Sequence, residues 1–138
     1  MSPGRRSIGA MSDPTNPNAA PVTWFEIGTG DVDAAKAFYG DVFGWTFRTD
    51  GPYTLITTTG PGPVGGIQST GTDHPAGAPA TYAIPCIQVK DVAATCKAAE
   101  SAGGKVVIDT TKAPDGLTFA QLTDPAGALL GVWTPPAG

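Results

Sequence analysis

Histidine, cysteine and glutamate, which supply many metal ligands, nucleophiles and acid–base groups in proteins, are rare in this sequence of 138 residues. There are one histidine, His74, two cysteines, Cys86 and Cys96, and two glutamates, Glu26 and Glu100. Zinc and iron sites are built from imidazole and thiolate groups, and hard divalent ions require several carboxylate or carbonyl oxygens. A single histidine makes a site with several histidines from one chain impossible. We therefore expect no metal and no cofactor.

Neither the cysteines nor the histidine form a recognisable catalytic arrangement. A cysteine nucleophile needs an activating base, and no histidine is near Cys86 in the sequence, so we expect a buried, unreactive thiol there. His74 lies in a stretch rich in glycine and proline, where an exposed loop histidine is more common than a ligand. The spacing of Cys86 and Cys96 matches neither a metal site nor a disulfide framework. Free thiols favour a reducing compartment, which we expect to be the cytoplasm.

The composition excludes other classes of protein. The net charge is −4 and the eight lysines and arginines are scattered, so no basic surface for nucleic acid is expected. No segment approaches the ~20 consecutive apolar residues that a membrane span requires. Hydrophobic residues make up 41% of the chain, which is enough for one packed core. We expect a disordered tail over 1–20 and a single domain over 21–138, with neither nucleic acid nor a membrane as partner.

Hydrophobic periodicity and turn residues divide this domain into two modules, 21–70 and 80–136, joined by a linker over 71–79. Each module is predicted as one strand, one helix and three further strands. In the first module these elements cover 22–27, 31–43, 45–49, 53–58 and 64–69. In the second module they cover 81–89, 91–102, 105–110, 118–123 and 128–134.

A constant offset of 60 positions relates the two modules, which indicates an internal repeat. The matched pairs are Ile27 and Ile87, Asp31 and Asp91, Val32 and Val92, Ala34 and Ala94, and Gly44 and Gly104. An aspartate at a helix start pairs with free backbone amides and suits the helix dipole. In the first helix an apolar stripe is predicted to pack on the sheet against Phe25 and Ile27; it consists of Val32, Ala35, Phe38 or Tyr39, and Val42.

Motifs in both modules resemble the vicinal oxygen chelate superfamily, also named the glyoxalase/bleomycin resistance protein/dioxygenase superfamily. They are WFEIGTGD at 24–31, AFYG at 37–40, FGW at 43–45, VKDV at 89–92, GG at 103–104 and DPAGA at 124–128. The resemblance covers about 22–135. It implies an α+β fold in which two βαβββ modules form a cupped, mostly antiparallel sheet with the helices on the outer face. It also implies a ligand inside the cup and a homodimer.

Many members of that superfamily bind a divalent metal through four residues on cup-facing strands, and the metal chelates two neighbouring oxygens of the substrate. The resemblance places these positions at Trp24, Gly66, Ile84 and Gly131, and none of these side chains can coordinate a metal. Within two positions, the polar side chains with plausible reach to a metal are Glu26, Gln68, Tyr82 and Cys86. We expect a metal-free cup.

Strand alternation assigns the residues that face the cup. The aromatic rings could stack on a flat ligand and the glutamines could orient it, as in many small-molecule sites; alternatively, the same residues only pack the sheet. The Gly65-Gly66 pair is expected to let a ligand or backbone approach closely. The predicted ligand-binding residues are Trp24, Tyr53, Gln68, Tyr82, Ile84, Cys86, Gln88, Phe119, Gln121 and Trp133.

Glu26 is the one candidate catalytic residue. On a concave apolar wall its pKa would be raised by desolvation, which suits general acid–base catalysis near neutral pH. Alternatively, the carboxylate has a structural role: backbone amides or a tyrosine hydroxyl at the junction of the modules hold it and fix the shape of the cup. We favour the structural role.

Three functions are compatible with these features. The first is a metal-independent small-molecule binding protein of the glyoxalase/bleomycin resistance type, with an aromatic or hydrophobic ligand. The second is a metal-free lyase, isomerase or cyclase in which Glu26 moves a proton. The third is a divalent-metal glyoxalase or dioxygenase, which ranks last because even two chains supply only two copies of His74.

Overall fold

The computed structural model describes residues 15–71 and 74–136, so most of the predicted tail lies outside the described residues. The elements follow the predicted order, and the α+β class is confirmed. The first module consists of β1 (Val22–Thr29), α1 (Val32–Phe43), β2 (Thr46–Asp50), β3 (Tyr53–Thr57) and β4 (Pro63–Ser69). The second consists of β5 (Tyr82–Gln88), α2 (Val92–Ser101), β6 (Lys105–Lys112), β7 (Thr118–Thr123) and β8 (Leu129–Thr134). In the described ranges, no helix is long and apolar enough to span a membrane.

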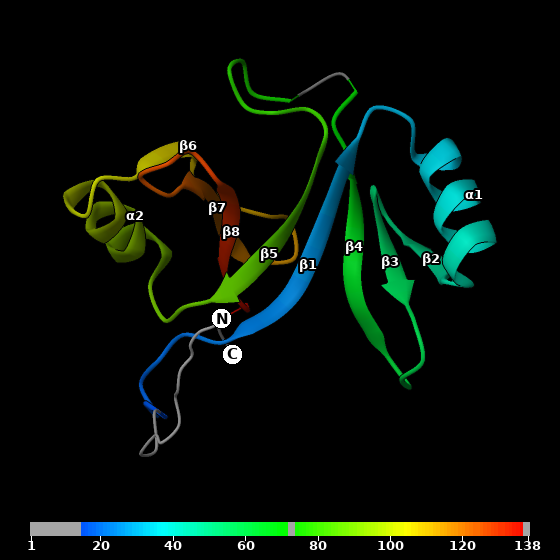
Figure 1. Cartoon of the computed structure of the whole chain (residues 1–138), viewed down its shortest axis with the longest axis horizontal. Coiled ribbons are helices and arrows are strands. Elements are labelled where there is room, and N and C mark those ends of the chain that lie inside the picture. The colour runs from blue at the N-terminus through cyan, green and yellow to red at the C-terminus, as the bar shows by residue number, and fades with distance from the viewer. Residues whose placement is uncertain (1–14, 72–73, 137–138) are drawn as a thin grey trace, which may run out of the picture.

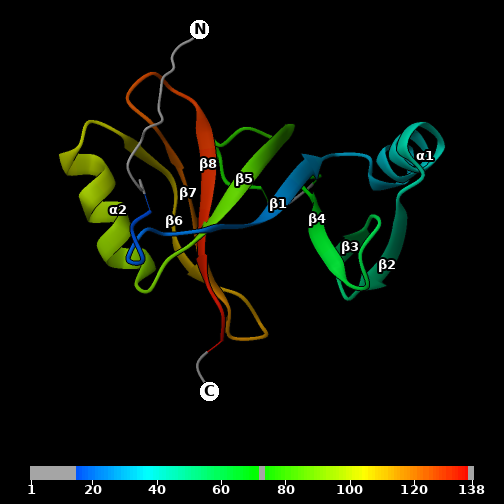
Figure 2. The ribbon, with the colours of Figure 1, turned by 60° about the horizontal axis from the view of Figure 1, so that its bottom comes forward.

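The eight strands form one curved sheet in the order β2-β3-β4-β1-β5-β8-β7-β6. Within each module the first and last strands pair in parallel, β1 with β4 and β5 with β8. All other neighbours are antiparallel, including β1 and β5, which join the two modules. Figures 1 and 2 show α1 beside β2–β4 and α2 beside β6–β8. The predicted cupped, mostly antiparallel sheet is confirmed.

Each helix begins at the aspartate that the repeat predicts. Oδ1 of Asp31 accepts a hydrogen bond from the backbone N–H of Ala34, and Oδ1 of Asp91 accepts one from Ala94, each at 3.0 Å. The matched glycines after the helices have different roles. Gly44 ends α1 in the left-handed conformation, with φ of 74°. Gly104 instead provides space, since a Cβ there would lie 2.5 Å from the carbonyl oxygen of Thr123.

One face of the sheet carries two apolar cores, one under each helix. Ile27, Ile56 and Ile67 form the core under α1. The core under α2 consists of Val92, Cys96, Ala120, Leu122 and Val132. Since strand side chains alternate between faces, Glu26, Ile84, Gln121 and Gly131 lie on the opposite, concave face.

Helix α1 is covered less completely than its predicted stripe implies. All of α1 lies within the described residues, and none of its side chains is buried. Phe38 is 55% exposed and Val42 56% exposed, so the prediction that they pack on the sheet is wrong. Tyr39 takes that place, stacked on Trp45 with ring centroids 5.1 Å apart. Phe38 makes edge-on ring contacts with Tyr39 at 5.0 Å and with Phe43 at 6.3 Å between ring centroids.

Candidate functional site

Glu26 is the centre of a hydrogen-bonded group on the concave face. The Tyr53 hydroxyl donates to Oε1 of Glu26 at 2.9 Å, and the Tyr82 hydroxyl donates to Oε2 at 2.6 Å. The indole N–H of Trp24 donates to the Tyr53 oxygen at 3.1 Å. We call these four residues the Glu26 cluster. Because Tyr53 belongs to β3 and Tyr82 to β5, the carboxylate of Glu26 connects the first module to the second.

Two glycines make room for the tyrosine rings. A Cβ at Gly66 would lie 2.1 Å from Cε2 of Tyr53, and a Cβ at Gly28 would lie 2.2 Å from Cε2 of Tyr82. The sequence predicts close approach of a ligand or backbone at Gly65-Gly66, but at Gly66 the protein's own tyrosine ring fills that space. Strand alternation places Gly28 on the concave face with Trp24 and Glu26, but it does not predict that the Tyr82 ring lies against Gly28.

The residues at the four positions that the resemblance assigns to metal ligands do not fit a divalent metal. Trp24, Gly66, Ile84 and Gly131 lie on strands β1, β4, β5 and β8 of the cup, and none carries an oxygen, sulfur or imidazole donor. Over 15–71 and 74–136, no three or more His, Cys, Asp or Glu side chains are grouped so that they could hold a metal ion. We therefore derive no chemical step through a metal.

Burial raises the pKa of Glu26 above its ordinary value, because the charged carboxylate loses hydration. Hydrogen bonds from Tyr82 and Tyr53 and the positive charge of His74 act in the opposite direction without cancelling it. Burial and the nearby carboxylate also raise the pKa of both tyrosines, so their hydroxyls remain protonated hydrogen-bond donors. Glu26 can consequently hold a proton at a higher pH than an exposed glutamate does.

His74 is nearer to this site than its place in the linker suggests. The sequence predicts an exposed loop residue, whereas the structure has His74 partly buried, with Nε2 2.6 Å from the carbonyl oxygen of Pro79. Its charge influences the pKa of Glu26, which places the ring within electrostatic range of the carboxylate. No sequence signal indicates this approach. It depends on the pairing of β1 with β5, which brings the end of the linker to the Glu26 cluster.

Cys86 lies on the concave face opposite Trp24 and is 8% exposed. Burial and the negative charge of Glu26 raise the pKa of its thiol to about 12. The thiol is therefore protonated at neutral pH, which suits a packing role and not a nucleophile. Its sulfur lies beside Gly131, where an added Cβ would be 3.2 Å from Sγ.

The other predicted ligand-binding residues form two groups on the concave face: three lie around the Glu26 cluster, and three lie in a second row farther from it. Gln121 is 4% exposed, and hydrogen bonding from its side chain lowers the pKa of the Tyr82 hydroxyl, so it extends the Glu26 cluster. Ile84, which is 5% exposed, lies opposite Glu26. Gln68 lies opposite Tyr53, and its amide nitrogen donates to the carbonyl of Ser69. Farther along the concave face, a second row across β5, β8 and β7 consists of Gln88, Trp133 and Phe119.

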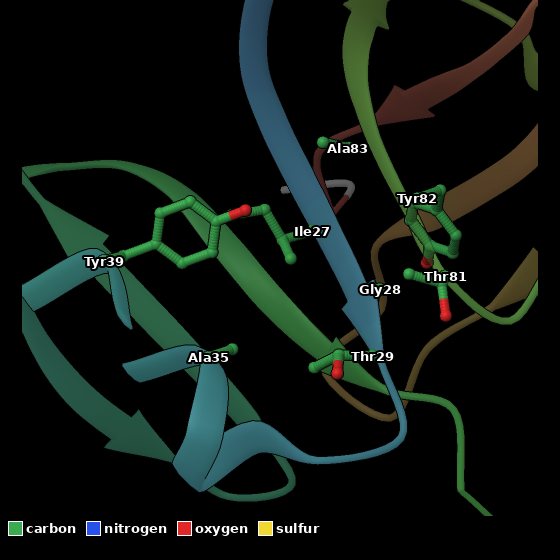
Figure 3. Close-up of a pocket in the computed structure, with 8 residues that line it drawn as sticks. All are labelled: Ile27, Gly28, Thr29, Ala35, Tyr39, Thr81, Tyr82 and Ala83. Atoms are coloured by element: carbon green, nitrogen blue, oxygen red, sulfur yellow. The ribbon is translucent and has the colours of Figure 1, made fainter. Parts of the chain in front are cut away.

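A cleft of about 350 Å³ lies on the outer side of the sheet, between α1 and the start of β5 (Figure 3). Ala35 and Tyr39 line it from the helix, and Ile27, Thr81 and Ala83 line it from the strands. Gly28, Thr29 and Tyr82 complete its lining, and the hydroxyl of Tyr82 also donates to Glu26. The sequence does not predict this cleft, although Ala35 and Tyr39 of the predicted apolar stripe line it.

The sequence matches one protein family and several curated proteins. The profile described as "Glyoxalase/Bleomycin resistance protein/Dioxygenase superfamily" matches residues 22–132. The protein named "Putative glyoxylase CFP32" from Mycobacterium bovis is 32% identical over 119 residues, which cover 80% of this chain and 44% of that protein. "Anthracycline biosynthesis protein DnrV" from Streptomyces peucetius is 30% identical over 126 residues, which cover 80% and 45%. The chain thus spans less than half the length of these relatives.

A solved structure shares the fold. The crystal structure of methylmalonyl-CoA epimerase from Mycobacterium tuberculosis superposes with a TM-score of 0.51 at 17% sequence identity, covering 83% of this chain and 87% of that chain. At this identity the similarity shows a shared arrangement of strands and helices, and it does not indicate what this chain binds or catalyses.

Proposed function

We propose that this chain, which belongs to the glyoxalase/bleomycin resistance protein/dioxygenase superfamily, is a metal-independent binding protein for an aromatic or hydrophobic small molecule. The observation that supports this most strongly is the Glu26 cluster. Aromatic rings and one carboxylate form this cluster in the part of the cup where the resemblance places the metal ligands of other members. Partly exposed rings with a few fixed polar groups are typical of small-molecule sites.

The proposed binding unit is the single domain predicted over 21–138, with modules 21–70 and 80–136 joined by the linker 71–79. Its proposed ligand-binding residues are those predicted above, with the Glu26 cluster at the centre. We propose the cytoplasm as the compartment, since Cys86 and Cys96 are both free and buried.

A titration with a neutral flat probe, N-phenyl-1-naphthylamine, tests the proposal. We expect saturable binding that quenches tryptophan emission, because Trp24 belongs to the cup. The Trp24→Phe variant should bind the probe about tenfold more weakly, as expected when a central aromatic contact is lost. Trp45→Phe is the matched control, since Trp45 packs under α1 on the outer face. Absence of saturable binding, or weakening in Trp45→Phe alone, would contradict a ligand site in the cup.

A metal-free lyase, isomerase or cyclase is the second candidate. The raised pKa of Glu26 favours it, because a carboxyl group beside two fixed hydroxyl donors could give or take a proton. Both carboxylate oxygens already accept hydrogen bonds within the protein, and this favours the structural role of Glu26. The metal-dependent glyoxalase or dioxygenase remains the third candidate, without a donor set to support it.

We also propose that the chain forms a homodimer through the outer face of α1. Phe38, Val42 and Phe43 are each more than half exposed there. The matching helix α2 instead buries Val92 and Cys96. The relatives that match this chain are more than twice as long as the matched segment, so a second copy would supply an equivalent amount of chain.

Sedimentation velocity tests the dimer. The unmodified chain should sediment as a species of twice the mass of one chain. Val42→Glu places a charge in the apolar patch and should weaken association about a hundredfold, as for a central interface residue. Ala98→Glu, at an exposed position of α2, should leave the mass unchanged. A monomeric unmodified chain, or equal effects of the two variants, would exclude this interface.

A further inference from the structure

Gln121 is a buried polar residue with an unused hydrogen-bond acceptor. Its side chain is 4% exposed, and within the described residues its Oε1 has no hydrogen-bond partner. Its neighbours Ala120 and Leu122 belong to the core under α2, so by alternation Gln121 points to the concave face. An unpaired buried acceptor costs about 1–3 kcal/mol, and such groups are rare in native proteins.

The hydrogen bonds of the Glu26 cluster fix which atom of the Gln121 amide is left over. Tyr82 has a single hydroxyl proton, and it donates this proton to Oε2 of Glu26. While Glu26 is ionised, the Tyr82 oxygen can therefore only accept from Gln121, so the amide nitrogen of Gln121 faces it. The remaining Oε1 is an acceptor that this side-chain network cannot satisfy.

We infer that Gln121 is a specificity-determining residue of the cup, and that the ligand carries an O–H or N–H group that donates to Oε1 of Gln121. This inference rests on the proposed function and narrows it: the ligand is a flat, largely apolar molecule with a hydrogen-bond donor, such as a phenol or an aryl amine. A site with a buried polar group discriminates strongly against analogues that lack the complementary group, because the site's own group is then left unpaired.

The test compares two probes of nearly equal shape, 1-naphthol and its methyl ether 1-methoxynaphthalene. On a purely apolar surface the ether should bind at least as tightly as the phenol, because it is the more hydrophobic molecule. We expect the unmodified protein to bind 1-naphthol at least tenfold more tightly, measured by tryptophan quenching at pH 8. Gln121→Met keeps the approximate size of the side chain without the acceptor, and should abolish this preference.

The outcomes separate the two proposals. If both probes bind the unmodified protein equally, the inference about Gln121 is wrong and the proposed ligand site stands. If 1-naphthol is preferred but the preference persists in Gln121→Met, another group recognises the donor and the inference is again wrong. If neither probe binds, the proposed function fails and the inference fails with it. The comparison on the unmodified protein decides the question even if Gln121→Met does not fold.

Discussion

Replacing Gly66 with alanine is expected to lower the free energy of unfolding by about 3 kcal/mol. The added Cβ would lie 2.1 Å from the ring of Tyr53, so the ring has to move. Overpacking of this kind costs about 1–3 kcal/mol. Moving the ring also breaks the hydrogen bond from Tyr53 to Glu26, and a hydrogen bond to a charged group contributes about 1.5–3 kcal/mol. Denaturant unfolding of the two proteins measures the difference.

Two comparisons connect this loss to the Tyr53 ring. Gly60→Ala is the matched control, because an added Cβ there meets nothing within 4 Å, and its effect should stay within about 0.5 kcal/mol. In a Tyr53→Ala background, Gly66→Ala should cost less than about 1 kcal/mol, since the nearest atoms it would meet all belong to Tyr53. An equal cost in both backgrounds would show that the strain arises in the backbone of β4.

The sequence alone predicts the order of elements and the two faces of the sheet. The repeat and its aspartates predict where both helices begin, because an aspartate cap is a local interaction that needs no tertiary context. Alternation correctly assigns the sides of strand β1, with Ile27 in the core and Glu26 on the concave face. These features depend on residues close together in the chain.

The contacts inside the site depend on register, which alternation does not determine. Tyr53 reaches Glu26 because β3 pairs with β4 and β4 with β1, and no local pattern encodes those two pairings. The same holds for His74, because the segment that contains it joins β4 to β5, the two strands that pair with β1. On α1, Val32 and Ala35 pack against the core as predicted, whereas the prediction left Phe38 and Tyr39 as alternatives. Phe38 and Tyr39 are adjacent on the helix, and the stacking of Tyr39 on Trp45 decides between them.

Replacing Glu26 with glutamine is expected to change how stability depends on pH. Because the pKa of Glu26 is raised on folding, the folded protein binds this proton more tightly than the unfolded chain, whose ordinary value is 4.5. The stability that protonated Glu26 contributes is thus fully present below pH 4.5. It is lost as the pH rises towards the folded pKa. Glutamine does not titrate, so the unfolding free energy of the unmodified protein minus that of Glu26→Gln should fall by up to about 1.4 kcal/mol per pH unit in this window.

Unfolding titrations of both proteins at several pH values above 4 measure this difference, and groups elsewhere in the chain cancel in it. Tyr53→Phe and Tyr82→Phe each remove a hydrogen bond that lowers the pKa of Glu26. In either background the fall should extend to higher pH. A difference that rises with pH would mean that the two tyrosines stabilise the charged carboxylate more than burial destabilises it. Glu26 would then be a fixed anion at neutral pH, suited to hold the two modules together and unable to act as a general acid.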